Sequence, residues 1–200
     1  MQRAIIFDFG NVLMFTTDYT PRHAWDARLG LPPGSVERAV HNSTSWVQAQ
    51  RGEIAITAYW QDVAERLSLS PEQTQQLAHD FYSGDTLDAD MLAYIRELRA
   101  TGHQTALLSN DSVELRPKLE RLNLLSLFDA VMISAEVGVM KPDAAAYTAV
   151  LAAVGRPAPE TVFVDDRMEN VEGARAVGML AVHYTKGTNL RHAITSLPEA

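Results

Sequence analysis

Acidic, hydroxyl and ammonium side chains stand close behind several apolar runs of this sequence. They are Asp8, Ser109, Lys141, Asp165 and Asp166. Paired carboxylates bind Mg²⁺, and a carboxylate can also attack phosphorus as a nucleophile. A lysine and a hydroxyl can neutralise the charge of a phosphoryl group in transfer. These residue types therefore predict a Mg²⁺-dependent phosphoryl-transfer site, if the fold brings them together.

Five short apolar runs indicate the strands that would position these groups. They are Ala4–Phe7, Thr105–Leu108, Ala130–Ile133, Thr161–Val164 and Leu180–His183. The runs are continuous, as expected for parallel strands that are covered on both faces. Helical patterns separate the later runs, so the sequence predicts an α/β fold with a doubly wound parallel sheet. Ligands of such sheets bind beyond the carboxyl ends of the strands, where the reactive residues stand.

The stretch between the first and second predicted strands is far longer than one crossover needs. Within it, apolar residues at helical spacing run from Ile56 to Leu67, and Ser70-Pro71 is a typical helix start. We therefore predict an all-helical cap at 18–85, inserted into a core domain made of 1–17 and 86–200. Residues 112–123 are ambiguous, because Pro117 either begins or breaks a helix there.

Composition excludes several classes of partner. The chain has 200 residues, a formal net charge of −8 and no cysteine. An acidic protein repels nucleic acid and anionic membranes, so we expect neither as a partner. No apolar stretch approaches the length of a membrane span, and the N-terminus does not read as a signal peptide. We expect a cytoplasmic protein that is a monomer or a weak homodimer and binds a small phosphorylated molecule.

Four motifs in order carry a resemblance to a known family. They are Ile6–Leu13 (Ile-Phe-Asp-Phe-Gly-Asn-Val-Leu), Leu108–Asn110, Met140–Pro142, and Phe163–Asp166 with Asn170–Ala174. With them the chain resembles the haloacid dehalogenase superfamily, most closely its sugar-phosphatase-like members and those similar to the N-terminal phosphatase domain of epoxide hydrolases. Each motif alone is weak, but four in the right order are specific. The resemblance covers nearly the whole chain and implies a Rossmann-like core with a helical cap.

The resemblance also implies roles for the residues of the first and last motifs. It makes Asp8 the nucleophile that forms an aspartyl-phosphate intermediate. It assigns the Mg²⁺ ligands to Asp8, the main-chain carbonyl of Gly10 and Asp166, with Asp165 as a neighbour or outer partner. Oxygen donors of this kind match the preference of Mg²⁺.

The two middle motifs resemble the part of the family site that binds phosphate. The resemblance implies that the Ser109 hydroxyl and the Lys141 ammonium hold the phosphoryl oxygens, and that Asn110 orients the phosphate or the nucleophile. We therefore expect a Mg²⁺-dependent phosphatase that acts on a small phosphorylated metabolite, with a sugar phosphate as the leading substrate class.

One position departs from the family pattern. Phosphatases of this superfamily usually have a second aspartate two residues after the nucleophile, which protonates the leaving group, and this chain has Gly10 there. Such acid–base help contributes about 10²–10⁴ in rate. Either the substrate has a good leaving group, or another group takes over, with Asp18, Tyr19 and His23 as candidates. Gly10→Asp should then raise turnover of phosphates with poor leaving groups.

Other interpretations of the same residues remain open. An aspartate after a strand often only caps a turn or helix, and Asp165-Asp166 fits that role. A dehalogenase of the same fold would need no Mg²⁺ and usually has a tyrosine at the position of Gly10. A weak or inactive phosphometabolite-binding protein also fits the glycine. A phosphorylation-receiver domain combines similar residues but has no helical insertion after its first strand.

Overall fold

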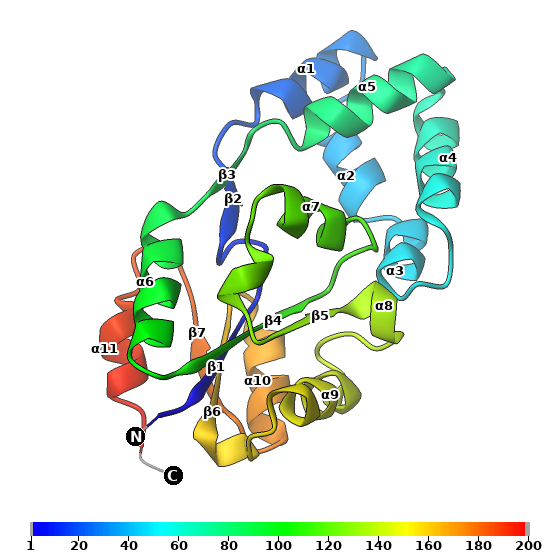
Figure 1. The fold of residues 1–200 in the computed structure, drawn as a ribbon. Helices are drawn as coiled ribbons and strands as arrows, with labels where there is room; N and C mark the ends of the chain where they lie inside the picture. The colour runs from blue at the N-terminus through cyan, green and yellow to red at the C-terminus, as the bar shows by residue number, and fades with distance from the viewer. Residues whose placement is uncertain (1, 199–200) are drawn as a thin grey trace.

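The computed structural model describes residues 2–198, and its centre is a five-stranded parallel sheet (Figure 1). The strand order is β5-β4-β1-β6-β7. The strands are β1 (Ala4–Phe7), β4 (Gln104–Ser109), β5 (Ala130–Ile133), β6 (Thr161–Asp165) and β7 (Leu180–His183). The predicted α/β class and all five strands are confirmed, because continuous apolar runs of this length bury well only as strands covered on both faces.

Side chains of β1 alternate between two apolar layers, one on each face of the sheet. Ile5 and Phe7 point into one layer, and Ala4 and Ile6 into the other. The first layer is closed by α6 (Ala89–Ala100), α7 (Leu115–Arg121) and α11 (Leu190–Thr195). The second is closed by α9 (Ala144–Val154) and α10 (Met168–Ala176). Shorter elements complete the core: η1 (Leu125–Leu127), α8 (Ser134–Val137) and η2 (Ala158–Glu160).

The long insertion after the first strand is helical. It contains α1 (Thr20–Arg28), α2 (Ser35–His41), α3 (Thr44–Gln50), α4 (Ile56–Leu67) and α5 (Pro71–Phe81). These helices share an apolar core of their own, in which Trp25, Tyr59 and Phe81 are buried. Ser70 and Gln73 form a capping box at the start of α5, as the Ser-Pro pair indicated.

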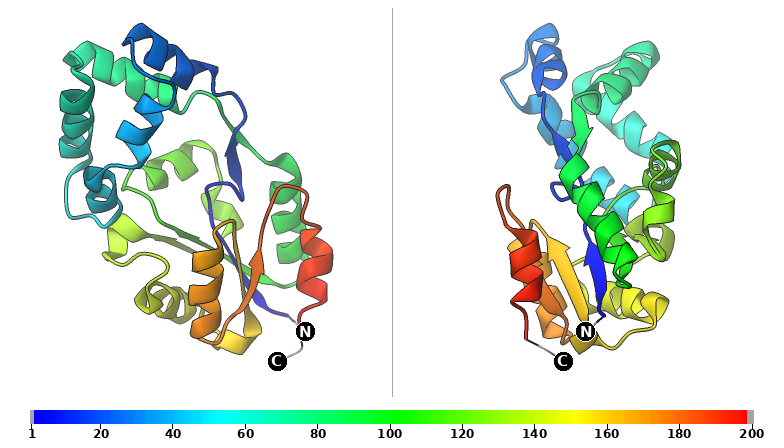
Figure 2. Two further views of the ribbon diagram at one scale, coloured as in Figure 1. Left: turned by 180° about the vertical axis from the view of Figure 1, so that it is seen from behind. Right: turned by 60° about the vertical axis from the view of Figure 1, so that its left-hand side comes forward.

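A short antiparallel ribbon connects the insertion to the core. It pairs β2 (Met14–Thr16) with β3 (Asp85–Leu87), and the sequence analysis did not predict it. The domain boundary that we place between residues 85 and 86 falls inside β3. The insertion lies at one end of the molecule, above the carboxyl ends of the parallel strands, in all three ribbon views (Figures 1 and 2). The division into core and cap stays a proposal.

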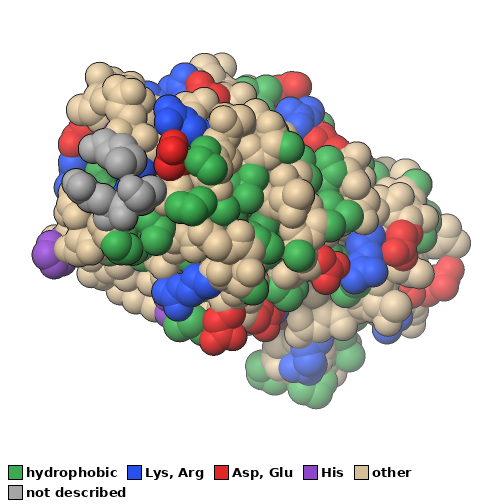
Figure 3. Space-filling view, turned by 90° about the horizontal axis from the view of Figure 1, so that it is seen from below, with side chains coloured by type: hydrophobic (Ala, Val, Ile, Leu, Met, Phe, Trp, Pro, Cys, Tyr) green, Lys and Arg blue, Asp and Glu red, His purple; other side chains and the backbone are tan. Residues whose placement is uncertain are grey.

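The ambiguous stretch at 112–123 contains α7. Pro117 lies in the first turn of this helix, where a backbone N–H has no intrahelical partner, so the proline is tolerated. No helix among residues 2–198 combines the length and apolar character needed to cross a membrane. On the face seen in Figure 3, Lys and Arg side chains are interspersed with acidic ones and do not gather into a basic patch.

Candidate active site

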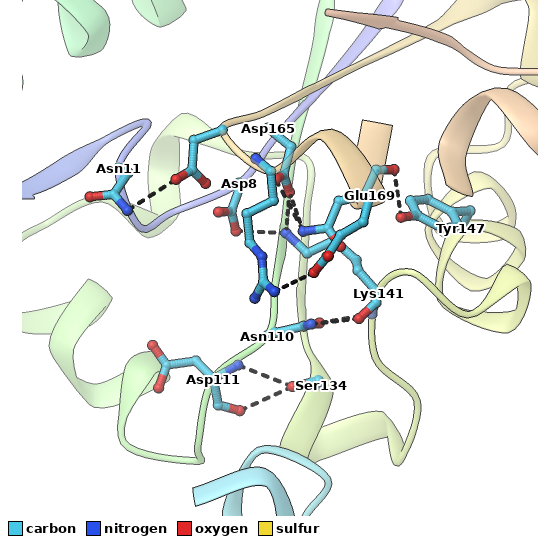
Figure 4. A network of polar contacts seen from close by, with 12 residues as sticks. Asp8, Asn11, Asn110, Asp111, Ser134, Lys141, Tyr147, Asp165 and Glu169 are labelled. Carbon is cyan, nitrogen blue, oxygen red and sulfur yellow. Dashed lines mark hydrogen bonds and ion pairs between the residues drawn. The ribbon is translucent and has the colours of Figure 1, made fainter. Parts of the chain in front are cut away.

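A buried lysine joins two carboxylates at the carboxyl edge of the sheet. The Lys141 Nζ donates hydrogen bonds to Asp8 Oδ1 and to Asp165 Oδ2, each over 2.7 Å (Figure 4). Asp8 directly follows β1, Asp165 ends the neighbouring strand β6, and Lys141 comes from the loop before α9. The Lys141 residue is only 3% exposed. Three residues far apart in the chain therefore meet in one buried ion-pair network.

The charges of this network do not balance. One ammonium faces two carboxylates, and burial together with Asp165 raises the pKa of Asp8 to about 6 although Lys141 lowers it. Burial also pushes the pKa of Lys141 down, but the two carboxylates outweigh it and hold this pKa above its usual value. The surplus negative charge is available to a further cation.

Protein donors occupy the carboxylate of Asp165 completely. Its Oδ1 accepts the Arg167 amide N–H at 2.8 Å and the Asn170 side chain at 3.0 Å. Its Oδ2 accepts Lys141 and, at 3.1 Å, Asn170 again. The side chain is fully buried. Asp165 is therefore placed to orient Lys141 rather than to bind a ligand of its own.

Asp166 is held differently, with one oxygen partly exposed to the site. Its Oδ2 accepts a hydrogen bond from Asn11 Nδ2 at 3.0 Å, and its main-chain oxygen lies 2.8 Å from His183 Nε2. Burial raises the pKa of its carboxyl group above the usual value. Carboxylate oxygens of Asp8, Asp165 and Asp166 lie within 4.8 Å of one another. Asp8 and Asp166, the two of these that line the cavity, offer hard oxygen donors that, with the surplus negative charge, fit a Mg²⁺ ion.

Asn110 clamps the loop that carries Lys141. The Asn110 Nδ2 donates to the Lys141 carbonyl at 2.7 Å, and the Lys141 amide N–H donates to Asn110 Oδ1 at 2.8 Å. On the other side of the loop, Gly173 of α10 leaves no room for a side chain, since a Cβ there would lie 2.8 Å from the Pro142 oxygen. Asn110 therefore holds the lysine loop, a role that the sequence did not indicate. Ser109 is buried at the end of β4.

Most of these polar groups open onto a cavity of about 310 Å³ between core and insertion. Of the predicted site residues, Asp8, Gly10, Ser109, Asn110, Lys141 and Asp166 line it, and Asp165 lies behind them. The three candidates for a replacement acid, Asp18, Tyr19 and His23, do not line it. Polar lining residues that the sequence analysis missed include Asn11, Arg22, Gln50, Asp85, Asp111, Lys118 and Asn170.

Some of the missed residues had a signal in the sequence. Asn11 and Asn170 lie inside the quoted family motifs, and Asp111 directly follows another. Arg22 had none, because its place depends on how the insertion folds. Its guanidinium donates to the Phe81 carbonyl at 2.7 Å and to Glu37 at 2.9 Å.

Comparison with known proteins identifies the family. Residues 2–178 match the family model described as haloacid dehalogenase-like hydrolase, so the chain belongs to this family of hydrolases. The sesquiterpene phosphatase AstK of Aspergillus oryzae is 30% identical to it, over 92% of this chain and 90% of that protein. Phosphatase MT3486 of Mycobacterium tuberculosis is also 30% identical, over 89% and 85% of the two chains. These relatives support the phosphatase class for this enzyme.

A solved structure shares the fold. The wild-type family enzyme BT-2542 of Bacteroides thetaiotaomicron, in complex with magnesium and inorganic phosphate, superposes with a TM-score of 0.80. The match covers 96% of this chain and 99% of that one, at 20% sequence identity. The expected Rossmann-like family core is thereby confirmed.

Proposed function

We propose that this protein is a Mg²⁺-dependent phosphatase that hydrolyses the monoester of a small phosphorylated metabolite through an aspartyl-phosphate at Asp8. The observation that carries the proposal is the buried network of Lys141 with Asp8 and Asp165, beside Asp166 in one cavity. A carboxylate held by an ammonium and open to a cavity is placed to attack a phosphoryl group.

The residues that would hold Mg²⁺ are Asp8, Asp166 and the main-chain carbonyl of Gly10. Hard oxygen donors and the uncompensated carboxylate charge support this assignment. Asp165 supports it from behind by orienting Lys141. When bound, the ion supplies positive charge to the phosphoryl oxygens.

Each remaining residue of the site has a defined part in the reaction. Asp8 attacks phosphorus, and the bond between phosphorus and the leaving oxygen breaks. Lys141 and the Ser109 hydroxyl stabilise the phosphoryl oxygens, which carry the negative charge of a loose transition state. Asn110 keeps Lys141 in register through its two hydrogen bonds to the lysine main chain. The helical cap excludes water and selects the leaving group.

A sugar phosphate is the first candidate substrate. The resemblance to sugar phosphatases suggests it, and the cavity beside Asp8 is lined by polar side chains such as Arg22, Gln50 and Lys118 that suit hydroxyl groups.

An apolar monophosphate is a second candidate. A cavity of about 370 Å³ between the insertion and α7 adjoins the first and shares with it His41, Trp46, Tyr82, Asp111 and Lys118. Its wall includes Tyr59 and Trp60, and aromatic side chains of this kind bind hydrocarbon and aryl groups. The name of the relative AstK, a sesquiterpene phosphatase, agrees with a substrate of this type.

A panel of phosphate monoesters tests the proposal and separates its rivals. It should contain sugar, aryl and prenyl monophosphates, assayed with Mg²⁺, with EDTA, and with the Asp8→Asn variant. We expect turnover that requires both Mg²⁺ and Asp8. Tight binding of a phosphate ester without turnover would instead identify a binding protein. Release of halide from a 2-haloacid without Mg²⁺ would identify a dehalogenase.

A further inference from the structure

The space beside Gly10 is empty of side chains. A Cβ added to Gly10 would meet no atom within 4 Å, so the missing acid has not been crowded out. The carboxylates that line the cavity among the described residues are Asp8, Asp85, Asp111 and Asp166. Asp8 and Asp166 belong to the proposed nucleophile and metal site. A replacement acid must therefore be sought in the other two.

Asp85 is already committed to structural contacts. Its Oδ1 accepts hydrogen bonds from the Thr16 hydroxyl at 2.8 Å and from Arg22 at 3.2 Å, and its Oδ2 lies 3.5 Å from Lys118 Nζ. Both oxygens of this carboxylate are therefore engaged by neighbouring side chains, and neither is left free to meet a substrate.

Asp111 is fixed by its main chain and leaves its carboxyl group free. The Asp111 N–H donates to the Ser134 hydroxyl at 3.0 Å, and that hydroxyl lies 3.2 Å from the Asp111 carbonyl oxygen. The side chain points away from Ser134 (Figure 4). Its Oδ1 accepts the Ser112 amide N–H at 2.7 Å, and no donor within residues 2–198 reaches its Oδ2.

The surroundings of Asp111 favour a carboxyl group that exchanges a proton near neutral pH. Burial raises the pKa of Asp111 to about 6, although the Ser112 amide, Lys118 and His41 lower it. Tyr59 and Tyr82 line the aromatic cavity together with Asp111. An acid–base catalyst works best with a pKa close to the working pH.

Asp111 also stands where a leaving group must pass. It lines the cavity beside Asp8 and the aromatic cavity beyond it. A substrate whose phosphate is at Asp8 and whose organic part extends into the aromatic cavity would pass Asp111, because Asp111 lines both cavities.

We propose that Asp111 is the general acid and base of the reaction, in place of the aspartate that this chain lacks at position 10. The proposal rests on the phosphatase function above. In the first step Asp8 attacks phosphorus, the bond to the bridging oxygen breaks, and the Asp111 carboxylic acid gives its proton to that oxygen. In the second step the Asp111 carboxylate takes a proton from water as the water oxygen attacks phosphorus and the bond between phosphorus and the Asp8 oxygen breaks. Inorganic phosphate leaves and both carboxyl groups return to their starting states.

Leaving-group dependence of the Asp111→Asn variant tests the proposal. With an alkyl phosphate, which needs a proton on its leaving oxygen, turnover should fall by about 10²–10⁴. With p-nitrophenyl phosphate, whose leaving group needs no proton, the first step should stay fast and water attack should be slow, giving a burst of nitrophenolate. Glu120→Gln is the matched control, because Glu120 is exposed on α7 and lines neither cavity.

A rescue experiment keeps the test decisive if the single variant is poorly folded. Adding Gly10→Asp to Asp111→Asn should restore turnover of the alkyl phosphate, since the space beside residue 10 admits a side chain. Unchanged turnover of Asp111→Asn, or an equal loss on both substrates with no burst and no rescue, would overturn the proposal. If the wild type itself shows no turnover that Asp8→Asn abolishes, it is the phosphatase function that fails.

Discussion

The two sides of the active-site cavity hold their charged groups in different ways. On the sheet side, Lys141 lies 2.7 Å from Asp8, and its side chain is 1% exposed. On the insertion side, where the β2–β3 ribbon below the insertion meets α7, Lys118 lies 3.5 Å from Asp85, and its side chain is 27% exposed. The lysine on the sheet side therefore belongs to a buried network, whereas Lys118 makes a longer and more exposed contact.

The difference follows from the backbone that carries each group. Asp8 follows β1, which pairs along its whole length with β4 and β6. Asp85 belongs to the ribbon of three residue pairs formed by β2 and β3. A central strand fixes the position of the residue that follows it, and a short ribbon does so less firmly. The proposed nucleophile is thus placed on the more firmly held side, and the proposed selection of substrate on the other.

Replacing each of the two lysines separately tests this difference, and the largest effect is expected for Lys141. Lys141→Met leaves Asp8 and Asp165 buried without their partner, which should cost about 3–5 kcal/mol of unfolding free energy. We also expect kcat to fall by about 10²–10³, since a positive charge on the phosphoryl group is lost. Urea unfolding and steady-state kinetics measure both.

Lys118→Met is the matched variant on the insertion side. A partly exposed ion pair at 3.5 Å contributes about 0–1 kcal/mol, so the unfolding free energy of the variant should differ little from that of the wild type. Equal losses of stability in the two variants would contradict the contrast between the two sides.

Asp111 should make the unfolding free energy of the protein depend on pH. Its pKa is about 6 in the folded protein against the ordinary 3.8, so the folded state binds the proton more tightly. This stabilisation is complete below pH 3.8 and is lost as the pH rises to about 6, which costs the wild type about 1–3 kcal/mol at neutral pH. Lys118 and His41 limit the loss by favouring the carboxylate.

Asp111→Asn, which cannot ionise, should gain stability relative to the wild type across that window. Urea unfolding in EDTA at a series of pH values measures the difference. A difference that does not vary with pH would show that the carboxyl group ionises freely.

A smaller effect is expected where α10 touches the lysine loop. A Cβ at Gly173 would lie 2.8 Å from the Pro142 oxygen and 2.9 Å from the Tyr147 hydroxyl oxygen. Gly173→Ala should therefore destabilise the protein by about 1–3 kcal/mol through overpacking, and should lower kcat by displacing Lys141. The neighbouring exposed Glu172→Ala should do neither; a matching loss there would point to α10 as a whole.

The smallest effect concerns the contact between insertion and core. Gln50 Nε2 donates to the Asn110 carbonyl at 2.8 Å, and its loss in Gln50→Ala should cost about 0.5–1.5 kcal/mol. We expect kcat to change less than in Lys141→Met. Gln61→Ala on the exposed face of α4 is the control. A loss of turnover as large as that of Lys141→Met would mean that the insertion side also carries the chemistry.

The sequence predicted the sheet well because burial on both faces leaves a plain apolar pattern. The predicted bounds of β1, β5 and β7 agree with the structure, whereas β4 and β6 each extend one residue further at the site. Ser109 and Asp165, the added residues, are polar but still pair with the neighbouring strands. Because both side chains are polar, the apolar pattern ended one residue before each of them.

The insertion side could not be predicted in the same way. The amphipathic pattern predicts helices there. It does not predict which residues face the cavity, because the way the insertion docks onto the core depends on tertiary contacts. Arg22 and Lys118 came into the cavity without a local signal. Asn110 was expected to bind substrate and does line the cavity, but its side-chain amide is engaged with the Lys141 main chain. Such pairing of a side chain with a distant main chain leaves no trace in the spacing of residues.

Trapping the covalent intermediate tests the central proposal most directly. Enzyme mixed with substrate and Mg²⁺ is quenched, treated with borohydride, which reduces an acyl phosphate to an alcohol, and digested for mass spectrometry. The proposal predicts homoserine at position 8 and at no other carboxylate. Steady turnover with an unmodified Asp8, or with the phosphoryl group on a different side chain, would contradict it.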